Sequence, residues 1–168
     1  MPLQLETERL KLRLFTIENF DELCVLQADP KVMQFMGEGG KLRSPKTSFS
    51  NLAFYLGQWV LLGYGFYAVF DAQDRFIGRA GVNHPHHWPA PEIAFAFRAD
   101  QWGKGFASEV VATLVPLALK SLKPERLISV IHSQNLASQK VVQKNGARLT
   151  EETEMEGSPV GIWDYPLS

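Results

Sequence analysis

The sequence predicts an α/β (α+β) fold, with a mixed, mostly antiparallel central sheet flanked by about four helices. The first observation concerns residues 65–98, where three runs rich in β-branched and aromatic residues are separated by connections too short for a parallel return. The second is that stretches with helical spacing of apolar residues lie before and after these runs. With 168 residues, the chain can bury one sizeable core and is too short for two. Residues 1–168 are therefore expected to form a single domain.

The N-terminal part predicts one strand and two helices. Residues 9–15 alternate apolar and basic side chains with period two, which is typical of a half-buried strand. Residues 16–30 place apolar side chains at helical spacing, with Thr16 as candidate N-cap and Pro30 closing the segment. After a glycine-rich loop, a second helix is expected over residues 46–62.

The rest of the chain predicts strands and helices in alternation. The helix at 105–122 carries one continuous apolar face, and a later helix ends on Gly146 as its C-terminal cap. In order, the expected elements are strands at 65–71, 75–84 and 91–98, a helix at 105–122, a strand at 126–133, a helix at 135–146, and a strand pair at 147–155 and 160–168. The complete predicted order is βααβββαβαββ.

Composition and charge exclude several classes of function. The 17 basic and 18 acidic residues give a formal net charge of −1, so the basic face that nucleic-acid binding requires is not indicated. A single cysteine, Cys24, rules out an intrachain disulfide and fits a reducing compartment. The longest apolar run is interrupted by Gly63 and Gly65 and is too short to cross a bilayer, and the N-terminus lacks a signal-peptide pattern. We expect a cytoplasmic monomer or homodimer with neither nucleic acid nor membrane as partner.

The stretch "QWGKGFASEV", residues 101–110, places two glycines directly before a helix. The first N–H groups of a helix have no partner within it and lie at the positive end of the helix dipole. Gly103 and Gly105 have no side chain to keep a ligand away from these groups, and Lys104 between them adds positive charge. The turn therefore predicts a pyrophosphate site, with a ligand-free tight turn as the alternative.

Two familiar phosphate motifs do not match. A Rossmann fingerprint needs a third glycine where the chain has Ser108, and a preceding parallel βαβ unit. A P-loop at 37–44 would need Ser or Thr where the chain has Leu42.

The stretch "EIAFAFRADQWGKGFASE", followed after one strand by "NLASQKVVQKNGAR", resembles the GNAT N-acetyltransferase superfamily. The branch it resembles includes the ribosomal-protein N-terminal acetyltransferases. The segments "LETERLKLRLFTIENFDEL", "DPKVMQFMG" and "GYGFYAVFD" resemble the same branch, so the likeness covers nearly the whole chain. The resemblance implies acetyl-CoA as cosubstrate and no metal.

The resemblance also implies a set of cofactor-binding residues. Backbone groups of Phe97 and Ala99 would pair with the pantetheine arm like an extra strand, while Asn135 would face the pantetheine. Trp102 stands where the superfamily pattern has Gln or Arg, so backbone donors must contribute more of the binding; Trp102 is equally consistent with a core residue. The N–H groups that would bind the pyrophosphate belong to Gly103, Lys104, Gly105, Phe106 and Ala107.

Ser138 and Glu92 are the candidate catalytic residues. Many members of the superfamily place a tyrosine general acid where this chain has Val142, so Ser138, near the thioester sulfur, is the better candidate to help the leaving thiolate. The purely structural alternative is that Asn135 and Ser138 only open a capped helix.

Acetyl transfer to an amine needs a neutral nucleophile and a hydrogen-bond donor for the carbonyl oxygen. Glu92 opens an otherwise apolar strand, where a carboxylate is expensive to bury. The resemblance places this glutamate beside the acetyl group, often acting through water; the alternative is a strand-end carboxylate in solvent. A backbone N–H around Ala94 or Phe95 is the expected oxyanion donor.

The acceptor is expected to be a primary amine, most readily an α-amino group of a peptide, protein N-terminus or amino acid. An α-amine has a pKa of about 8, whereas lysine at about 10.4 needs a stronger base. Rival interpretations are a non-catalytic acyl-CoA-binding sensor or structural module, and a dinucleotide or nucleotide enzyme. The histidines His84, His86 and His87 are flanked by prolines, which favours an exposed hairpin over a zinc site, with contact to the substrate as a further alternative.

Overall fold

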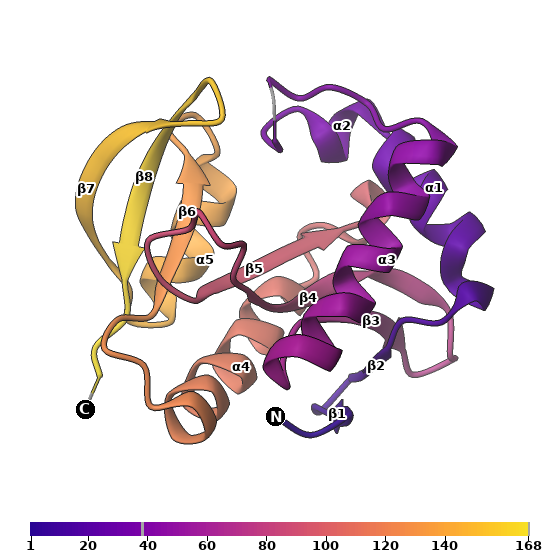
Figure 1. Cartoon of the computed structure of the whole chain (residues 1–168), viewed down its shortest axis with the longest axis horizontal. Helices are drawn as coiled ribbons and strands as arrows, with labels where there is room; N and C mark the ends of the chain where they lie inside the picture. The colour runs from indigo at the N-terminus through magenta and orange to yellow at the C-terminus, as the bar shows by residue number, and fades with distance from the viewer. Residues whose placement is uncertain (38, 168) are drawn as a thin grey trace.

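An eight-stranded sheet forms the centre of the structure, a computed structural model that describes residues 1–37 and 39–167 (Figure 1). Neighbours in the sheet follow the order β1-β2-β3-β4-β5-β6-β8-β7. The strands are β1 (Gln4–Glu6), β2 (Leu10–Leu14), β3 (Phe66–Asp71), β4 (Phe76–Asn83), β5 (Glu92–Phe97), β6 (Ile128–His132), β7 (Arg148–Met155) and β8 (Ser158–Asp164). The helices of the described residues are α1 (Phe20–Ala28), α2 (Pro30–Met33), α3 (Pro45–Leu62), α4 (Phe106–Leu122) and α5 (Leu136–Lys144), with 3-10 turns η1 (Ile17–Asn19) and η2 (Ala99–Gln101).

The predicted fold class is confirmed. Every neighbouring pair of strands is antiparallel except β5 and β6, so the sheet is mixed and mostly antiparallel. The consecutive strands β3, β4 and β5 pair antiparallel, as their short connections require. The predicted helix cap at Gly146 is also present, with φ at +91°.

Two short elements are missing from the predicted order. The three residues of β1 pair with β2, with Leu5 opposite Leu12, and so extend the sheet at its edge. The first helix ends at Ala28, and Pro30 then opens α2, while the Asp29 side chain accepts the N–H of Lys31. Proline suits the first turn of a helix because the N–H it lacks would have no partner there. Pro30 therefore separates two helices, which gives one helix more than expected.

Both faces of the sheet are covered, which explains why β3 is buried along its whole length. Its side chains alternate between two hydrophobic clusters, with Tyr67 and Val69 in one and Ala68 and Phe70 in the other. The first cluster includes the apolar face of α4, and the second includes α1 and α3. In Figure 1, α3 crosses one face of the sheet while α4 lies on the other. None of the helices in the described ranges is long and apolar enough to span a bilayer.

The sheet opens between β5 and β6. These parallel strands share a single register pair, Glu92 with Ile128, and diverge beyond it (Figure 1). The junction is held by Ser129, whose hydroxyl donates to the Ile93 carbonyl at 2.6 Å and lies 3.0 Å from the Tyr165 hydroxyl. The remainder of β5 therefore has one edge without a neighbouring strand, at the centre of the molecule.

Candidate functional site

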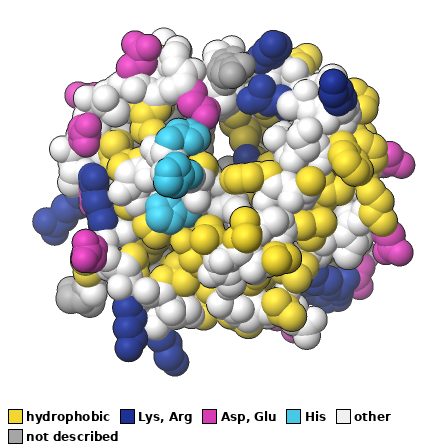
Figure 2. Space-filling model, viewed as in Figure 1, with side chains coloured by type: hydrophobic (Ala, Val, Ile, Leu, Met, Phe, Trp, Pro, Cys, Tyr) yellow, Lys and Arg dark blue, Asp and Glu magenta, His cyan; other side chains and the backbone are white. Residues whose placement is uncertain are grey.

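Two cavities lie along the opening between β5 and β6. The first, of about 590 Å³, extends over the end of β5, the glycine turn, and the starts of α4 and α5; we call it the turn cavity. The second, of about 310 Å³, lies over β4 and β5 beneath α3 and the β7–β8 turn; we call it the sheet cavity. Figure 2 shows the surface hollowed between its two halves, with histidine side chains gathered along one rim and basic atoms inside. The cavities share five lining residues: Phe35, Met36, Phe95, Asn135 and Ser138.

The glycine turn has the geometry of an anion site. Gly103 and Gly105 have φ angles of +77° and +83°, which glycine adopts without the strain that a side chain would cause. Gly105 is the N-cap of α4 and supplies no capping side chain, so the N–H groups at the start of α4 have no side-chain partner from it. Both glycines line the turn cavity together with Phe106 and Ala107.

Arg9 fixes this turn to the N-terminal strands. Its guanidinium donates to the Lys104 carbonyl at 2.9 Å, pairs with Glu109 at 2.7 Å, and lies 4.7 Å from the centroid of the Phe106 ring. Burial favours the neutral form of Glu109, but hydrogen bonds from Thr7 and Arg9 outweigh burial and leave the pKa of this carboxyl below its usual value. Sequence reasoning missed Arg9 because nothing local links residue 9 to residues 104–109.

The free edge of β5 presents backbone groups to the turn cavity. The N–H of Arg98 donates to Ile77 of β4, whereas the carbonyls of Ile93 and Phe97 accept hydrogen bonds from Ser129 and Trp102 on the opposite side. Because backbone groups alternate along a strand, the N–H and C=O of Phe95 point away from β4, toward the opening. Of the two candidate oxyanion donors, the N–H of Phe95 therefore faces the opening and that of Ala94 points toward β4; the oxyanion role itself stays a prediction.

Most of the predicted cofactor residues line the turn cavity, and two do not. Trp102 is half-exposed and therefore not a core residue; its indole N–H donates to the Phe97 carbonyl at 2.8 Å, so that carbonyl already has a partner. Lys104 directs its ammonium to the Gln101 side chain, 2.9 Å away, and neither Lys104 nor Ala99 lines the turn cavity. The predicted residues that do line it are Phe97, Trp102, Gly103, Gly105, Phe106, Ala107, Asn135 and Ser138.

Asn135 and Ser138 lie where the two cavities meet. The Asn135 side chain is the N-cap of α5 and accepts the Ser138 N–H at 3.1 Å, as expected for a cap. The Ser138 side chain is half-buried and lines both cavities. Val142, one turn further along α5, is fully buried in the core. The cap and the proposed site role of these residues are compatible.

Glu92 is buried at the other end of the sheet cavity, with 6% of its surface exposed, so the interpretation of it as a solvent-facing strand end is wrong. It accepts hydrogen bonds from the Asn83 amide at 3.2 Å and the Val130 N–H at 3.3 Å. Burial raises the pKa of Glu92 to about 7, although Asn83, Val130, Arg79 and Trp88 each lower it. The carboxyl can therefore take up or release a proton near neutral pH.

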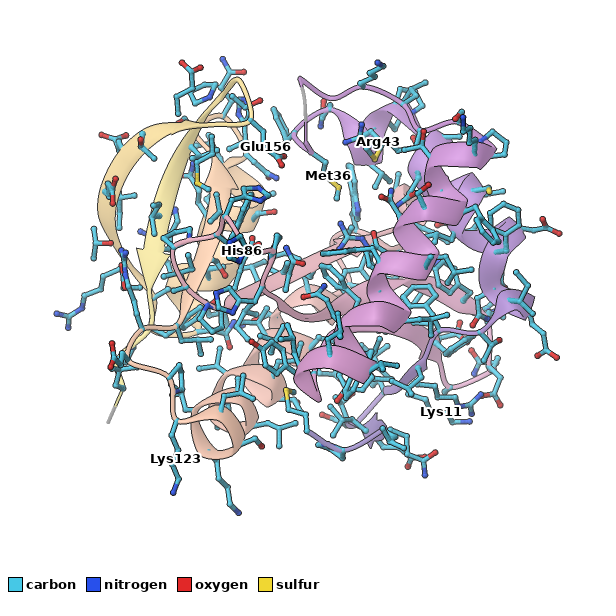
Figure 3. All side chains as sticks on the ribbon, viewed as in Figure 1. Lys11, Met36, Arg43, His86, Lys123 and Glu156 are labelled. Carbon is cyan, nitrogen blue, oxygen red and sulfur yellow. The ribbon has the colours of Figure 1, made fainter. Side chains whose placement is uncertain are left out.

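Two arginines line the sheet cavity and were missed in the sequence. Arg79, on β4, lies opposite Ala96 of β5, and Arg43 precedes α3. Figure 3 shows Arg43 and Met36 on one side of the opening, across from Glu156 in the β7–β8 turn. A usable signal existed for Arg79, because a charged residue in the apolar run 76–83 is as unusual as Glu92 in 92–97.

The aromatic residues around the end of α3 and the histidines His84, His86 and His87 mostly lie outside the two cavities. Trp59 and Tyr67 lie in the core, Phe66 lines the sheet cavity, and the Tyr64 hydroxyl is 3.1 Å from His84 Nδ1. Within the described part of the chain, no group of three His, Cys, Asp or Glu is arranged to hold a metal ion.

Comparisons with known proteins identify a family and similar chains. A family model described as an acetyltransferase (GNAT) domain matches residues 9–148. The uncharacterized N-acetyltransferase p20 of Bacillus licheniformis is 29% identical over 174 residues, covering 97% of this chain and 94% of that protein.

Solved structures share the fold. The acetyltransferase from Agrobacterium tumefaciens strain C58 superposes with a TM-score of 0.83 at 24% identity, covering 96% of this chain and 94% of that one. RimL, a ribosomal L7/L12 α-N-protein acetyltransferase solved with coenzyme A, superposes with a TM-score of 0.78 at 18% identity, covering 97% and 95%. Because the family model covers most of the sequence and the fold agrees over its whole length, the chain belongs to the GNAT acetyltransferases.

Proposed function

We propose that this protein transfers an acetyl group from acetyl-CoA directly to a primary amine, most readily an α-amino group of a peptide, protein N-terminus or amino acid. The observation that carries the proposal is the meeting of the two cavities at Phe95 and Ser138, with the buried Glu92 lining the sheet cavity. The turn cavity offers the glycine turn and the free β5 edge to a cofactor, and the sheet cavity offers a base to an amine.

The turn cavity fits coenzyme A by its chemistry. Backbone N–H groups at the start of α4 suit a pyrophosphate, and the β5 edge suits the amide-bearing pantetheine arm. The Arg9 guanidinium holds the turn from outside by its hydrogen bond to the Lys104 carbonyl, and its ion pair with Glu109 offsets the negative charge of that carboxylate near the turn. When bound, acetyl-CoA supplies the acetyl group as a thioester.

Three residues of this chain would then assist separate steps of the acetyl transfer. Glu92, directly or through water, takes a proton from the incoming ammonium and so exposes the lone pair that attacks. The Phe95 N–H donates to the carbonyl oxygen as negative charge develops there. The neutral amine forms a bond to the thioester carbonyl carbon, and Ser138 donates a hydrogen bond to the sulfur as the carbon–sulfur bond breaks. The departing thiolate takes up the second proton of the attacking nitrogen and is released as the coenzyme A thiol. No covalent acyl-enzyme is needed, and Cys24, the sole cysteine, lines neither cavity.

The acceptor preference follows from matching pKa values. A base with a pKa of about 7 is well suited to an α-amine of pKa about 8 and poorly suited to a lysine of pKa about 10.4. The alternative function is a non-catalytic acyl-CoA-binding sensor or structural module, which the turn cavity alone would support.

Two measurements test the proposal. Release of coenzyme A thiol from acetyl-CoA, followed with a panel of amines, separates an enzyme from a binding module, because only an enzyme shows amine-dependent release. Competing a peptide with a free N-terminus against its N-blocked, lysine-containing twin then tests the acceptor. Faster acetylation of the blocked peptide would refute the α-amine preference and leave the acetyltransferase assignment in place.

A further inference from the structure

Arg79 is a buried cation in the sheet cavity and forms no ion pair within residues 1–37 and 39–167. Only 9% of its surface is exposed, and its Nη1 atom is buried without a hydrogen-bond partner among the described residues. Its guanidinium packs on aromatic rings instead, 4.1 Å from the Phe66 centroid and 5.3 Å from that of Tyr55. A buried charge without a paired group is costly, so a structural role alone does not account for it.

Glu92 accepts no hydrogen bond from Arg79 among the described residues. Its two oxygens accept hydrogen bonds from Asn83 and Val130, and no ion pair joins Glu92 to Arg79 among the described residues. Arg79 lowers the pKa of Glu92 only through space. The guanidinium therefore remains available to a ligand in the cavity that both residues line.

The two charges lie at separate positions along one face of the sheet. Arg79 is opposite Ala96, and Asn83 is opposite Glu92, so the register places four residues of strand, roughly 13 Å, between the two pairs. The Arg79 side chain shortens this gap because it reaches over Phe66, which pairs with Gly81. Between them, the small side chain of Ala94 leaves room for a substrate.

Arg43 adds a second positive charge to the same cavity. Its backbone is held by the Gln27 carbonyl at 3.0 Å, and its side chain lies against Gly37. Figure 3 shows Arg43 at the rim of the opening, on the side of α2 and α3. The cavity thus combines a proton acceptor with two guanidinium groups.

Resting on the proposed function, we propose that the acceptor carries a carboxylate a few bonds from its amine, and that Arg79, assisted by Arg43, binds this carboxylate while the amine faces Glu92. A guanidinium binds a carboxylate through paired hydrogen bonds, and packing on aromatic rings holds its plane in place for that contact. The carboxylate is supplied either by an acidic side chain next to the N-terminus of a peptide or by the free C-terminus of a short peptide.

Three dipeptides that differ only in carboxylates test this assignment. Alanylglutamine amide has none, alanylglutamate amide carries one on its side chain, and alanylglutamine with a free C-terminus carries one at its end. The wild-type protein is expected to acetylate at least one of the charged dipeptides with kcat/KM roughly tenfold to a hundredfold above the uncharged one, the range for a hydrogen bond between charged groups. The charged dipeptide with the higher kcat/KM shows whether the carboxylate comes from an acidic side chain or from a free C-terminus.

Variants assign the preference to Arg79. Arg79→Met keeps an unbranched side chain but removes the guanidinium and its charge, and should abolish the preference, whereas Arg79→Lys should keep part of it. Arg43→Gln should reduce it by less. Arg148→Gln, which removes a charge from exposed β7, is the matched control and should change nothing. A melting shift with coenzyme A, measured for each variant, shows that the fold and the turn cavity are intact.

The outcomes are distinct. Equal kcat/KM for all three dipeptides in the wild-type protein would overturn the inference, whether or not any variant folds, and leave the proposed function standing. A preference that persists in a folded Arg79→Met protein would also overturn it. Thiol release with none of the amines would instead refute the proposed function itself.

Discussion

The two cavities differ in the groups that line them. The turn cavity presents mostly backbone groups and apolar side chains, at an exposed glycine turn and a free strand edge. The sheet cavity presents charged side chains that are buried among aromatic rings, chiefly Glu92 and Arg79. Backbone donors bind an anion with little dependence on pH, whereas a buried carboxyl changes its charge near neutrality. Damage to the first cavity should therefore reduce binding, and damage to the second should reduce turnover.

The largest effect is expected for Glu92→Gln. The amide keeps the shape of the side chain but cannot take a proton, so kcat should fall by roughly 10²–10⁴-fold, the usual contribution of a general base. The affinity for acetyl-CoA, measured by titration, should remain nearly unchanged because Glu92 does not line the turn cavity. Glu154→Gln on exposed β7 removes a similar charge and should leave both quantities unchanged.

The pH profile sharpens this prediction. Burial raises the pKa of Glu92 to about 7, and a base must be ionised to act, so kcat/KM of the wild-type protein should rise with pH through this value. The Glu92→Gln protein should lack this rise and keep only the later one that follows the amine's own pKa. A wild-type rate that stays constant from mildly acidic to mildly basic pH would remove Glu92 from the mechanism.

The next effect is loss of coenzyme A binding in Gly105→Glu. A carboxylate at the start of α4 would block and repel a pyrophosphate, so the ligand-induced rise in melting temperature should disappear. At a hundredfold excess over Kd, that stabilisation amounts to about 2.7 kcal/mol in the wild-type protein. The backbone strain of a side chain at φ +83° lowers stability in the absence of ligand as well.

A matched control separates strain from ligand loss. Gly63→Glu introduces the same side chain at φ +73°, with open space around it and at the C-terminal end of α3. It should lower the melting temperature by a similar amount while the shift with coenzyme A remains. If Gly105→Glu folds and still shows the full shift, the glycine turn is not the pyrophosphate site.

The difference between the turn cavity and the sheet cavity also explains which site residues could be predicted from the sequence. The turn cavity is built from short continuous segments, so glycine spacing, the helix start and the Asn135 cap were recognisable from residue types alone. Glu92 was recognisable because it interrupts an apolar strand. Its partners Asn83 and Val130 were not, because they come from β4 and β6, and only the register of the sheet brings them together.

Long-range ion pairs and very short elements account for the other omissions. Arg9 reaches Lys104 and Glu109 across about a hundred residues of sequence, and no periodicity encodes that contact. The elements β1 and α2 have three and four residues, too few to show a repeating apolar pattern. The single register pair between β5 and β6, which creates the opening, is likewise a property of the assembled sheet.

The smallest effect is expected for Ser138→Ala, at the boundary between the two cavities. If its hydroxyl donates to the departing thiolate, its removal should lower kcat by roughly tenfold, and by less when another step limits the rate. The α5 cap uses the backbone N–H of residue 138, which alanine retains, so the melting temperature should hardly change. Asn135→Ala provides the contrast, since it removes the cap itself and should cost about 1 kcal/mol of stability. A Ser138→Ala protein that melts lower but turns over at the wild-type rate would make Ser138 a structural residue, and departure of the thiolate would then need another donor at the junction of the cavities.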